Sequence, residues 1–354
     1  MQRRTFIQGV VGGAVAGTMG VSGSADAQEK PSAIRIGYPG VGIGNRPFVG
    51  GQPSADLHLR GALEEEFKAD GIKVEWNFLR GAGPAVNELF ANGLLDISPL
   101  GDLPFIVGTA SGLKRRVLAS SWQRGNLYLV VPSDSSINSI KDTVGKKVAI
   151  FKGTNIQLGV AQVLAANGLT EKDLKSINMD TNTSRAAIVT KDVDAYWGGS
   201  DVLSLRDQGV AKVVYSTRGD PRFVRQGAFV VNESYVQKYP HIVQRVINRL
   251  VKVSKLEAEQ ADNPAPIYQL WTKSGVQFAN FKEDFQGLSL KTFSSPLLDP
   301  YMVSALKQKV KIAHKFGLIK QPFDIEPLID RSFLNRALKE QGLEGFWPDQ
   351  PSAV

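Results

Sequence analysis

The sequence of 354 residues contains no cysteine. This absence excludes disulfide bridges, thiolate metal sites, cysteine nucleophiles and lipid anchoring through a modified N-terminal cysteine. Histidine is also scarce, and the three residues at positions 58, 241 and 314 are too scattered in the sequence to predict a metal site. After Val21, no uncharged apolar run approaches the ~20 residues that a membrane-spanning helix needs. We therefore expect no metal, no other cofactor and no transmembrane segment in the mature chain.

Positive charge is in excess but is not concentrated. The chain carries 42 lysine and arginine residues against 34 acidic residues, a formal net charge of +8. Basic residues occur as isolated pairs, such as Arg115-Arg116 and Lys146-Lys147, without a long basic run or a nucleic-acid-binding motif. This pattern disfavours nucleic acid as a partner and is compatible with small anionic ligands. With 42% hydrophobic residues, a chain of this length is expected to form about two globular domains.

The N-terminal segment has the pattern of an export signal. Arg3 and Arg4 precede a glycine-rich apolar stretch at residues 9–21, and Ala25-Asp26-Ala27 supplies the small residues that a signal peptidase reads. The paired arginines resemble a twin-arginine signal, and the apolar stretch is too short and too rich in glycine for a membrane anchor. The sequence therefore predicts a twin-arginine signal peptide over residues 1–27 and a soluble mature protein outside the cytoplasm.

The first part of the mature chain alternates between strand and helix patterns. Apolar, β-rich runs at residues 33–38, 73–79 and 95–99 each end in a turn. Helical periodicity or composition occupies residues 57–68 and 85–92 between them. Repetition of strand, turn and helix predicts a parallel sheet with crossover helices, and hence an α/β fold.

Two similar strands frame the middle of the chain. The run at residues 227–232 resembles the run at 127–131, being apolar, extended and followed by a polar turn. Further strands are predicted between them, at residues 147–151, 193–197 and 212–215. Two framing strands suggest that the chain crosses twice between two lobes. We expect residues 28–131 plus 229–354 to form the first lobe and residues 132–228 the second.

The last third of the sequence has mostly helical patterns. The stretch at residues 241–262 is amphipathic, and its apolar stripe is most simply explained by packing onto the core. The sequence does not indicate whether residues 291–354 support one lobe or brace both.

Several segments together resemble a known family. They are, in chain order, Ile34-Arg35-Ile36-Gly37-Tyr38, Gly101-Asp102-Leu103-Pro104, Gly145-Lys146-Lys147-Val148-Ala149, Lys152-Gly153-Thr154-Asn155, Ser184-Arg185-Ala186-Ala187, Val193-Asp194-Ala195 and Tyr239-Pro240-His241-Ile242-Val243. Their order and spacing resemble the periplasmic substrate-binding proteins of ABC importers, and most closely the aliphatic-sulfonate, taurine and nitrate group. The resemblance covers most of residues 33–260.

The resemblance implies a two-lobed periplasmic binding protein of type II. Such a protein has two hinge strands, here near residues 128–132 and 227–232, and closes a cleft on a small ligand. It implies a monomer without enzymatic activity that delivers its ligand to ABC permease subunits. The ligand it favours is a small anionic or zwitterionic organic solute, above all an aliphatic or aromatic sulfonate. Nitrate, a carboxylate and a pyrimidine-like compound remain alternatives.

Turns between a strand and a helix are the strongest candidate anion sites. A helix N-terminus has unpaired N–H donors and a partial positive charge. Gly153-Thr154-Asn155 is the best example, where Thr154 and Asn155 either contact a ligand oxygen or only cap the helix. At Gly101-Asp102, the carboxylate either caps the helix, which we favour, or binds an amine of a zwitterionic ligand.

Other candidate ligand-binding residues follow from side-chain type and from their place in the resemblance. Arg185 offers a fork for two anionic oxygens, or is a surface arginine at the lobe edge. Trp122 and Trp197 are either apolar cleft walls or core residues. Gly40, in a glycine-rich loop, and Ser200, in the turn after the Val-Asp-Ala segment, complete the predicted set.

The chain departs from the sulfonate-binding pattern after residue 197. The group usually has a Trp-Asp-Pro-like turn there, whereas this chain has Gly198-Gly199, which either enlarges the pocket or frees it to admit a different ligand. The loop from Pro39 to Pro53 is also longer and richer in glycine than in the group.

Rival functions have weaker support. Gly40-Val41-Gly42-Ile43-Gly44 follows a strand, and Arg80 could suit a 2′-phosphate, so an NADP-dependent oxidoreductase is a remote alternative. The sequence lacks the G-x-S-x-G motif that would indicate a hydrolase. The related thiamine pyrimidine-precursor synthases carry a cysteine-rich motif that this chain lacks.

Overall fold

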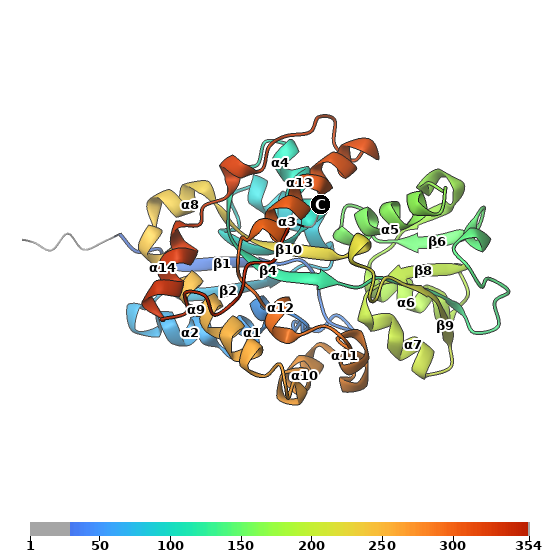
Figure 1. Ribbon diagram of the computed structural model, residues 1–354, viewed down its shortest axis with the longest axis horizontal. Coiled ribbons are helices and arrows are strands. Elements are labelled where there is room, and N and C mark those ends of the chain that lie inside the picture. Colours follow the sequence, from blue (N-terminus) through green and yellow to red (C-terminus); the bar gives the residue numbers. More distant parts are fainter. Residues whose placement is uncertain (1–28, 353–354) are drawn as a thin grey trace, which may run out of the picture.

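The computed structural model describes residues 29–352, which form two α/β lobes placed end to end (Figure 1). Each lobe is built on one five-stranded mixed sheet. The predicted two-lobed α/β fold is confirmed. The predicted signal peptide, residues 1–27, lies outside the described residues.

The first sheet has the strand order β2-β1-β3-β10-β4. Its strands are β1 (Ala33–Tyr38), β2 (Lys73–Phe78), β3 (Ile97–Gly101), β4 (Arg115–Gly125) and β10 (Arg225–Asn232). β1 runs parallel to β2 and β3, whereas β10 runs antiparallel to β3 and β4. β3 is buried along its whole length, as expected for a central strand covered by helices on both faces.

The second sheet repeats this plan with the order β7-β6-β8-β5-β9. Its strands are β5 (Tyr128–Pro132), β6 (Lys147–Ile150), β7 (Lys175–Asn178), β8 (Ala195–Gly198) and β9 (Ala211–Ser216). β6 is parallel to β7 and β8, and β5 is antiparallel to β8 and β9. Separate apolar clusters cover its two faces.

Helices flank both sheets (Figure 1). Those of the second lobe are α5 (Asn155–Ala166), α6 (Thr181–Val189) and α7 (Leu203–Asp207). Those of the first lobe are α1 (Pro53–Leu59), α2 (Ala62–Phe67), α3 (Ala82–Ala91), α4 (Asp102–Ala110), α8 (Glu233–Lys238), α9 (Pro240–Glu259), α10 (Ala265–Trp271), α11 (Phe278–Asp284), α12 (Leu290–Phe293), α13 (Pro300–Lys315) and α14 (Ser332–Glu340). Single 3₁₀ turns are η1 (Lys68–Asp70), η2 (Lys141–Thr143), η3 (Glu171–Asp173), η4 (Ser200–Val202), η5 (Pro221–Phe223), η6 (Thr272–Ser274) and η7 (Glu326–Leu328).

The chain passes between the sheets through residues 126–127 and residues 217–224. Leu127 and Thr217 are hydrogen bonded to each other, so the two crossings run side by side. The lobe boundaries predicted from the sequence differ from these crossings. The prediction assigns residues 128–131 to the first lobe and residues 225–228 to the second. β5 instead pairs only with β8 and β9 of the second sheet, and β10 pairs only with strands of the first sheet.

Local structure otherwise follows the sequence patterns, except at one helix and two strands. The helix predicted over residues 57–68 is two helices, because Gly61 between them has a left-handed φ of 62° that ends α1 and begins α2. β4 and β7 have no counterpart among the predicted strands, since polar residues interrupt the apolar pattern in each.

The C-terminal segment braces both lobes. α13 packs against α4 of the first lobe and α5 of the second, while α14 packs against α9. α9, the predicted amphipathic helix, buries its apolar stripe in the core of the first lobe, as expected. The segment that the sequence left unplaced therefore lies over the junction between the lobes.

Candidate functional site

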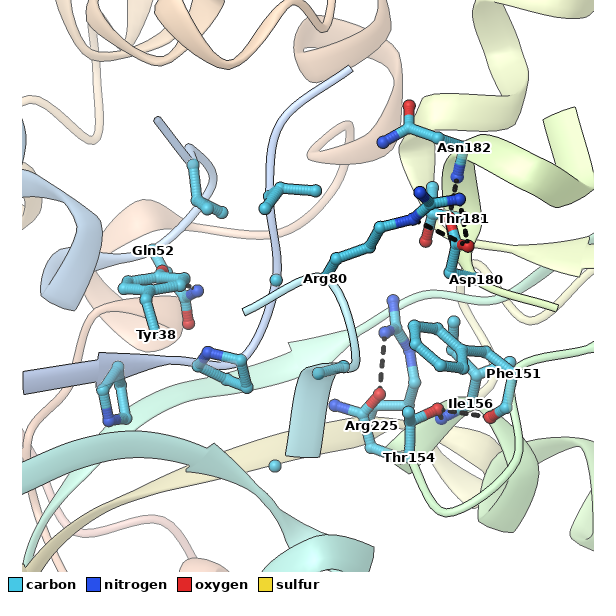
Figure 2. Close-up of a pocket in the computed structure, with 18 of the residues that line it drawn as sticks. Tyr38, Gln52, Arg80, Phe151, Thr154, Ile156, Asp180, Thr181, Asn182 and Arg225 are labelled. Carbon is cyan, nitrogen blue, oxygen red and sulfur yellow. Dashed lines mark hydrogen bonds and ion pairs between the residues drawn. The ribbon is translucent and has the colours of Figure 1, made fainter. Parts of the chain in front are cut away.

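A cleft at the junction of the lobes contains two adjoining cavities. One cavity, which we call the polar chamber, has a volume of about 200 Å³; the other, the aromatic chamber, has about 270 Å³. Both lobes line both chambers, and the chambers share part of their walls, namely Pro39, Gly40, Val41, Val49, Gln52, Trp122, Ile156, Thr181 and Arg225. Figure 2 shows the polar chamber.

Arg225 is the cation on the wall between the chambers. It stands at the first position of β10, directly after the second crossing, and pairs in register with Gly125 at the end of β4. Its Nε donates to the carbonyl oxygen of Asn126, 3.1 Å away, and its Nη1 to Asn155 Oδ1, 3.3 Å away. Its guanidinium carbon lies 5.8 Å from the ring centroid of Trp122. Arg225 therefore links the first crossing, α5 and the first sheet.

Burial governs the electrostatics around Arg225. Desolvation lowers the pKa of its guanidinium, and the carboxylates of Asp284, Asp102 and Asp201 act in the opposite direction. An arginine side chain stays charged even when its pKa is lowered. A half-buried cation that faces a cavity favours an anion as the occupant.

The N-terminus of α5 forms one wall of the polar chamber (Figure 2). Thr154 caps the helix, since its Oγ1 accepts from the backbone N–H of Ile156 at 3.2 Å and donates to the carbonyl oxygen of Phe151 at 2.7 Å. Gly153 has a φ of 72°, and a Cβ there would lie 2.7 Å from Pro84. Because the cap is a neutral hydroxyl, the partial positive charge of the helix end is not cancelled.

The N-terminus of α6 forms the facing wall but is already neutralised. The carboxylate of Asp180 caps α6 by accepting from the backbone N–H groups of Asn182 and Thr183. Arg80, on the first lobe, reaches the same carboxylate with Nη2 2.9 Å from Oδ2 (Figure 2). This pair joins the two lobes across the mouth of the polar chamber.

Further contacts join the lobes around the cleft. Asn182 exchanges hydrogen bonds with the glycine-rich loop of the first lobe, accepting from Gly44 N–H and donating to the carbonyl oxygen of Gly42. On the far side, Arg206 of α7 makes two 2.7 Å contacts with the carboxylate of Glu283 on α11. The two lobes are therefore closed on each other at both edges of the cleft.

Aromatic side chains from the C-terminal helices line the aromatic chamber. Phe281, Phe285 and Phe293 contribute to it together with Trp122 of β4. The Phe285 and Phe293 rings meet edge to face at 4.7 Å, and Trp122 stacks on Phe293 at 6.4 Å. The rings belong to a buried aromatic cluster, so their positions are set by packing.

Two carboxylates also line the aromatic chamber. Asp284 accepts hydrogen bonds from Tyr128 Oη at 2.6 Å and from Asn126 Nδ2 at 3.0 Å. Asp201 accepts from the backbone N–H of Gly199 at 3.1 Å, and Arg185 lies 3.7 Å from its other oxygen. Burial raises the pKa of both carboxyl groups.

Six of the nine predicted ligand-binding residues lie on the chamber walls. These are Gly40, Gly101, Trp122, Thr154, Asn155 and Ser200. Gly101 lies so near α5 that a Cβ on it would stand 2.8 Å from Asn155 Nδ2. The structure thus brings these residues together, while contact with a ligand stays a prediction for each.

The other three predicted residues do not line either chamber. Asp102 is fully buried at the first position of α4, accepts from the backbone N–H of Leu103 and pairs with Lys309. Arg185 points to Asp201 and Ser204 behind the cavity wall. Trp197 is fully buried in the core of the second lobe. Trp197 is therefore a core residue, the alternative that the sequence left open. Arg185 is not the surface arginine of its alternative, because its side chain is only 12% exposed. Asp102 does not act as the cap of α4, since Gly101 holds the N-cap position.

Sequence reasoning missed Arg225 as a site residue and considered Arg80 only for a nucleotide. The glycine-rich loop at residues 40–44 does not have the geometry of a dinucleotide-binding turn. Such a turn opens directly into a helix, whereas here the helix α1 begins only at Pro53, well after Gly44. The useful signal for Arg225 was its place at the start of the second framing strand, which was predicted to begin at residue 227 instead of 225.

The two glycines after Trp197 differ in their surroundings. A Cβ on Gly198 would stand 2.5 Å from Val202 Cγ1, so packing requires glycine there. Gly199 lines the aromatic chamber, and a Cβ on it would find its nearest neighbours at 3.4 and 3.5 Å. Only Gly199 therefore leaves space that a larger side chain could occupy.

Comparison with known proteins agrees with this geometry. A family model described as NMT1/THI5 like matches residues 66–255, which is just over half of the chain. The chain belongs to this family. Among the residues that the structure describes, no helix is long and apolar enough to cross a membrane, and no group of side chains has the composition of a metal site.

Relatives of the chain are named for sulfonate binding. The crystal structure of the periplasmic sulfonate-binding protein SsuA of Methylobacillus flagellatus KT is 31% identical, with a TM-score of 0.73, over 90% of this chain and 98% of that one. A protein of Bacillus subtilis (strain 168) named for binding aliphatic sulfonates is 24% identical over 81% of this chain and 85% of its own length. The alkanesulfonate-binding protein SsuA of Xanthomonas axonopodis pv. citri, solved with MOPS bound, shares the fold at 22% identity and a TM-score of 0.70, over 86% of this chain and 100% of that one.

Proposed function

We propose that this chain is the periplasmic solute-binding component of an ABC importer and that it captures a sulfonate in the cleft between its lobes. The observation that carries the proposal is the half-buried guanidinium of Arg225, which faces the cleft beside the neutral-capped N-terminus of α5. Sulfonate-binding relatives that cover most of the chain support the same ligand class.

The donors in the polar chamber suit a compact oxyanion. Arg225 offers charged N–H groups, and the α5 terminus with Asn155 adds donors from the other lobe. Arg80 is already paired with Asp180, so it neutralises a carboxylate at the cleft mouth and adds no net positive charge there. We therefore propose that the sulfonate group binds at Arg225.

The position of Arg225 couples binding to lobe closure. It stands beside both crossings, and its partners Asn126 and Asn155 belong to the first crossing and to the second lobe. An anion held by Arg225 and the α5 terminus contacts both lobes only when they are closed. Binding then shifts the population to the closed form, which the membrane permease recognises. We propose that the ligand is released unchanged.

We also propose that the chain is exported by the twin-arginine route and acts as a monomer. The Arg3-Arg4 pair and Ala25-Asp26-Ala27 support this route. Replacing Arg3 and Arg4 together by lysine should abolish export. The mature N-terminus, read by mass spectrometry, should be Gln28.

A ligand panel on the mature protein tests the function. The protein is unfolded and refolded to remove carried-over solute, and thermal unfolding is followed with sulfonates, including taurine and MOPS, and with nitrate, carboxylates, a pyrimidine and NADPH. A ligand at a hundred times its Kd stabilises the protein by ~2.7 kcal/mol, which shifts the midpoint measurably. Sulfonates should give this shift and be recovered unchanged.

A matched pair of variants tests the role of Arg225. Arg225→Gln should raise the sulfonate Kd about ten- to hundredfold, because charge-assisted hydrogen bonds are lost. Arg222→Gln is the control: this arginine is exposed, pairs with Asp220 and does not line the chambers. Equal effects of the two variants on the Kd, or shifts from nitrate, carboxylates or NADPH but not from sulfonates, would contradict the proposal.

A further inference from the structure

We propose that the aromatic chamber holds the tail of the ligand, and that the protein therefore selects sulfonates with a ring or a similarly bulky, uncharged apolar tail over short sulfonates such as taurine. This inference rests on the proposed function and places the sulfonate group in the polar chamber. The two chambers meet at Arg225 and Trp122, which line both of them. A ligand anchored at Arg225 can therefore extend into the aromatic chamber.

The size of the aromatic chamber exceeds the needs of a short ligand. Its volume is about 270 Å³, whereas a cavity of about 150 Å³ is enough to hold a benzene ring in a protein core. Methanesulfonate or taurine placed at Arg225 would leave most of this chamber without ligand contacts. A ring in the same position would bury its faces against protein.

The walls of the aromatic chamber are suited to a ring. Trp122, Phe281, Phe285 and Phe293 come from β4, α11, the residue after α11 and α12, so three separate segments of the first lobe converge on it. The three phenylalanines are at most 6% exposed and pack within one aromatic cluster. Because packing fixes these rings before binding, an aromatic tail needs little reorganisation of the protein.

Gly199 keeps the chamber open on the side of the second lobe. A Cβ on Gly199 would lie 3.4 Å from Arg225 Nη2 and 3.5 Å from Asp201 Oδ1, two atoms of chamber-lining residues. The residue has a φ of −92°, which any amino acid can adopt. A larger side chain at this position therefore fills the chamber without straining the backbone.

The carboxylates of Asp201 and Asp284 restrict the chemistry of the tail. Their oxygens accept hydrogen bonds from Gly199, Tyr128 and Asn126 and, when ionised, donate none. A second anionic group on the tail would meet acceptors and negative charge. The chamber therefore favours uncharged tails over carboxylated ones.

Titration calorimetry with three matched ligands tests this inference on the refolded mature protein. Benzenesulfonate should bind at least about tenfold more tightly than methanesulfonate, because the ring is buried in the aromatic chamber. 4-Sulfobenzoate, which adds only a carboxylate at the far end of the ring, should lose most of that gain. Methanesulfonate reports on the polar chamber alone.

Two variants connect the selectivity to the chamber. Gly199→Val should weaken benzenesulfonate binding about tenfold and methanesulfonate binding by a smaller factor, because its side chain fills the aromatic chamber while also touching Arg225 Nη2. Phe293→Leu keeps the core apolar but removes one ring face, and it should lower the benzenesulfonate affinity selectively. In both variants, binding of methanesulfonate also shows that the protein is folded.

The outcomes separate this inference from the proposed function. If no sulfonate binds, the proposed function itself fails. If methanesulfonate binds as tightly as benzenesulfonate, or if both variants weaken the two ligands equally, the protein is a sulfonate binder and the assignment of the tail chamber is overturned. Tight binding of 4-sulfobenzoate would overturn the charge restriction.

Discussion

Lys309 and Asp102 form a buried ion pair, with Lys309 Nζ 3.1 Å from Asp102 Oδ2. Their side chains are only 5% and 0% exposed. Lys309 Nζ also donates to the carbonyl oxygen of Val224 at 2.9 Å, in the second crossing, and lies 3.4 Å from Gln162 Oε1 on α5. One side chain of α13 thus connects α4 of the first lobe, the crossing segment and a helix of the second lobe.

Replacing Lys309 should destabilise the protein strongly. Lys309→Met leaves the carboxylate of Asp102 buried without its partner, and we expect a loss of about 3–5 kcal/mol in the free energy of unfolding. Urea denaturation measures the loss. Lys311→Met removes an exposed lysine from the same helix and should change stability by less than about 0.5 kcal/mol.

A second substitution at Asp102 distinguishes a lost ion pair from lost packing. Asp102→Asn combined with Lys309→Met removes both charges and should recover much of the stability that Lys309→Met alone loses. If the double variant is as unstable as the sum of both single variants, the pair does not interact in the way the geometry implies.

The Arg80–Asp180 pair should tune affinity modestly. It closes the mouth of the cleft between the lobes, but Arg80 is 58% exposed, so solvent screening limits the pair to about 0.2–1 kcal/mol. Arg80→Gln should therefore raise the ligand Kd less than about fivefold, and the effect should shrink in high salt. Lys73→Gln, at an exposed lysine outside both chambers, is the control. A loss of binding beyond about thirtyfold would mean that Arg80 contacts the ligand directly.

Glu257 should make stability depend on pH. This side chain on α9 is fully buried beside Asp56 of α1, which accepts from Trp271 Nε1 at 2.8 Å and from Arg60 Nε at 3.0 Å. Burial raises the pKa of Glu257 well above its ordinary value, the nearby charge of Asp56 raises it further, and Arg60 acts in the opposite direction. The folded protein therefore keeps a proton that the unfolded chain loses.

The sign of this dependence follows from proton binding. Above the ordinary pKa of a glutamate, the unfolded state binds fewer protons at this residue, so the free energy of unfolding falls as pH rises, by up to ~1.4 kcal/mol per pH unit. Glu257→Gln should remove this contribution. The free energy of unfolding of the variant, relative to that of the parent protein, should therefore increase between about pH 5 and about pH 8. Glu259→Gln, exposed on the same helix, serves as control. Parallel stability curves for the parent and Glu257→Gln would contradict the prediction.

The two tryptophans predicted as cleft walls should respond differently to substitution. Trp197→Phe alters the core of the second lobe and should lower the free energy of unfolding by about 1–3 kcal/mol with an unchanged ligand Kd. Trp122→Leu removes a wall of both chambers and the ring beside Arg225, and should raise the Kd about three- to thirtyfold. Calorimetry and denaturation of both variants measure the two effects. A Kd that changes in Trp197→Phe but not in Trp122→Leu would reverse the assignment.

Local features of the site were predictable because neighbouring residues determine them. The strand predicted at residues 33–38 matches β1, and the turn at Gly153-Thr154-Asn155 begins α5 with Thr154 as the cap. A positive φ at Gly153 and a hydroxyl that accepts from a backbone N–H two residues later are short-range relationships. The alternation of strands and helices was sufficient for the α/β class.

The choice among chemically equivalent residues was not predictable in this way. Arg185, within α6, and Arg225, at the start of β10, offer the same guanidinium chemistry, but only Arg225 follows a crossing and faces the cleft. Asp102 is buried in an ion pair instead of facing the cleft, and its partner Lys309 lies more than two hundred residues later in the chain. The aromatic chamber required Trp122 to meet three phenylalanines from α11 to α12.

The sequence by itself therefore determined the α/β class, the Thr154 cap of α5 and the family resemblance, since these depend on residues close together in the chain. Only the tertiary structure decided which lobe each framing strand joins, which arginine faces the cleft and where the C-terminal segment packs. Those outcomes depend on long-range strand pairing and on the burial of charges against distant partners, and hydrophobic periodicity contains no information about such partners.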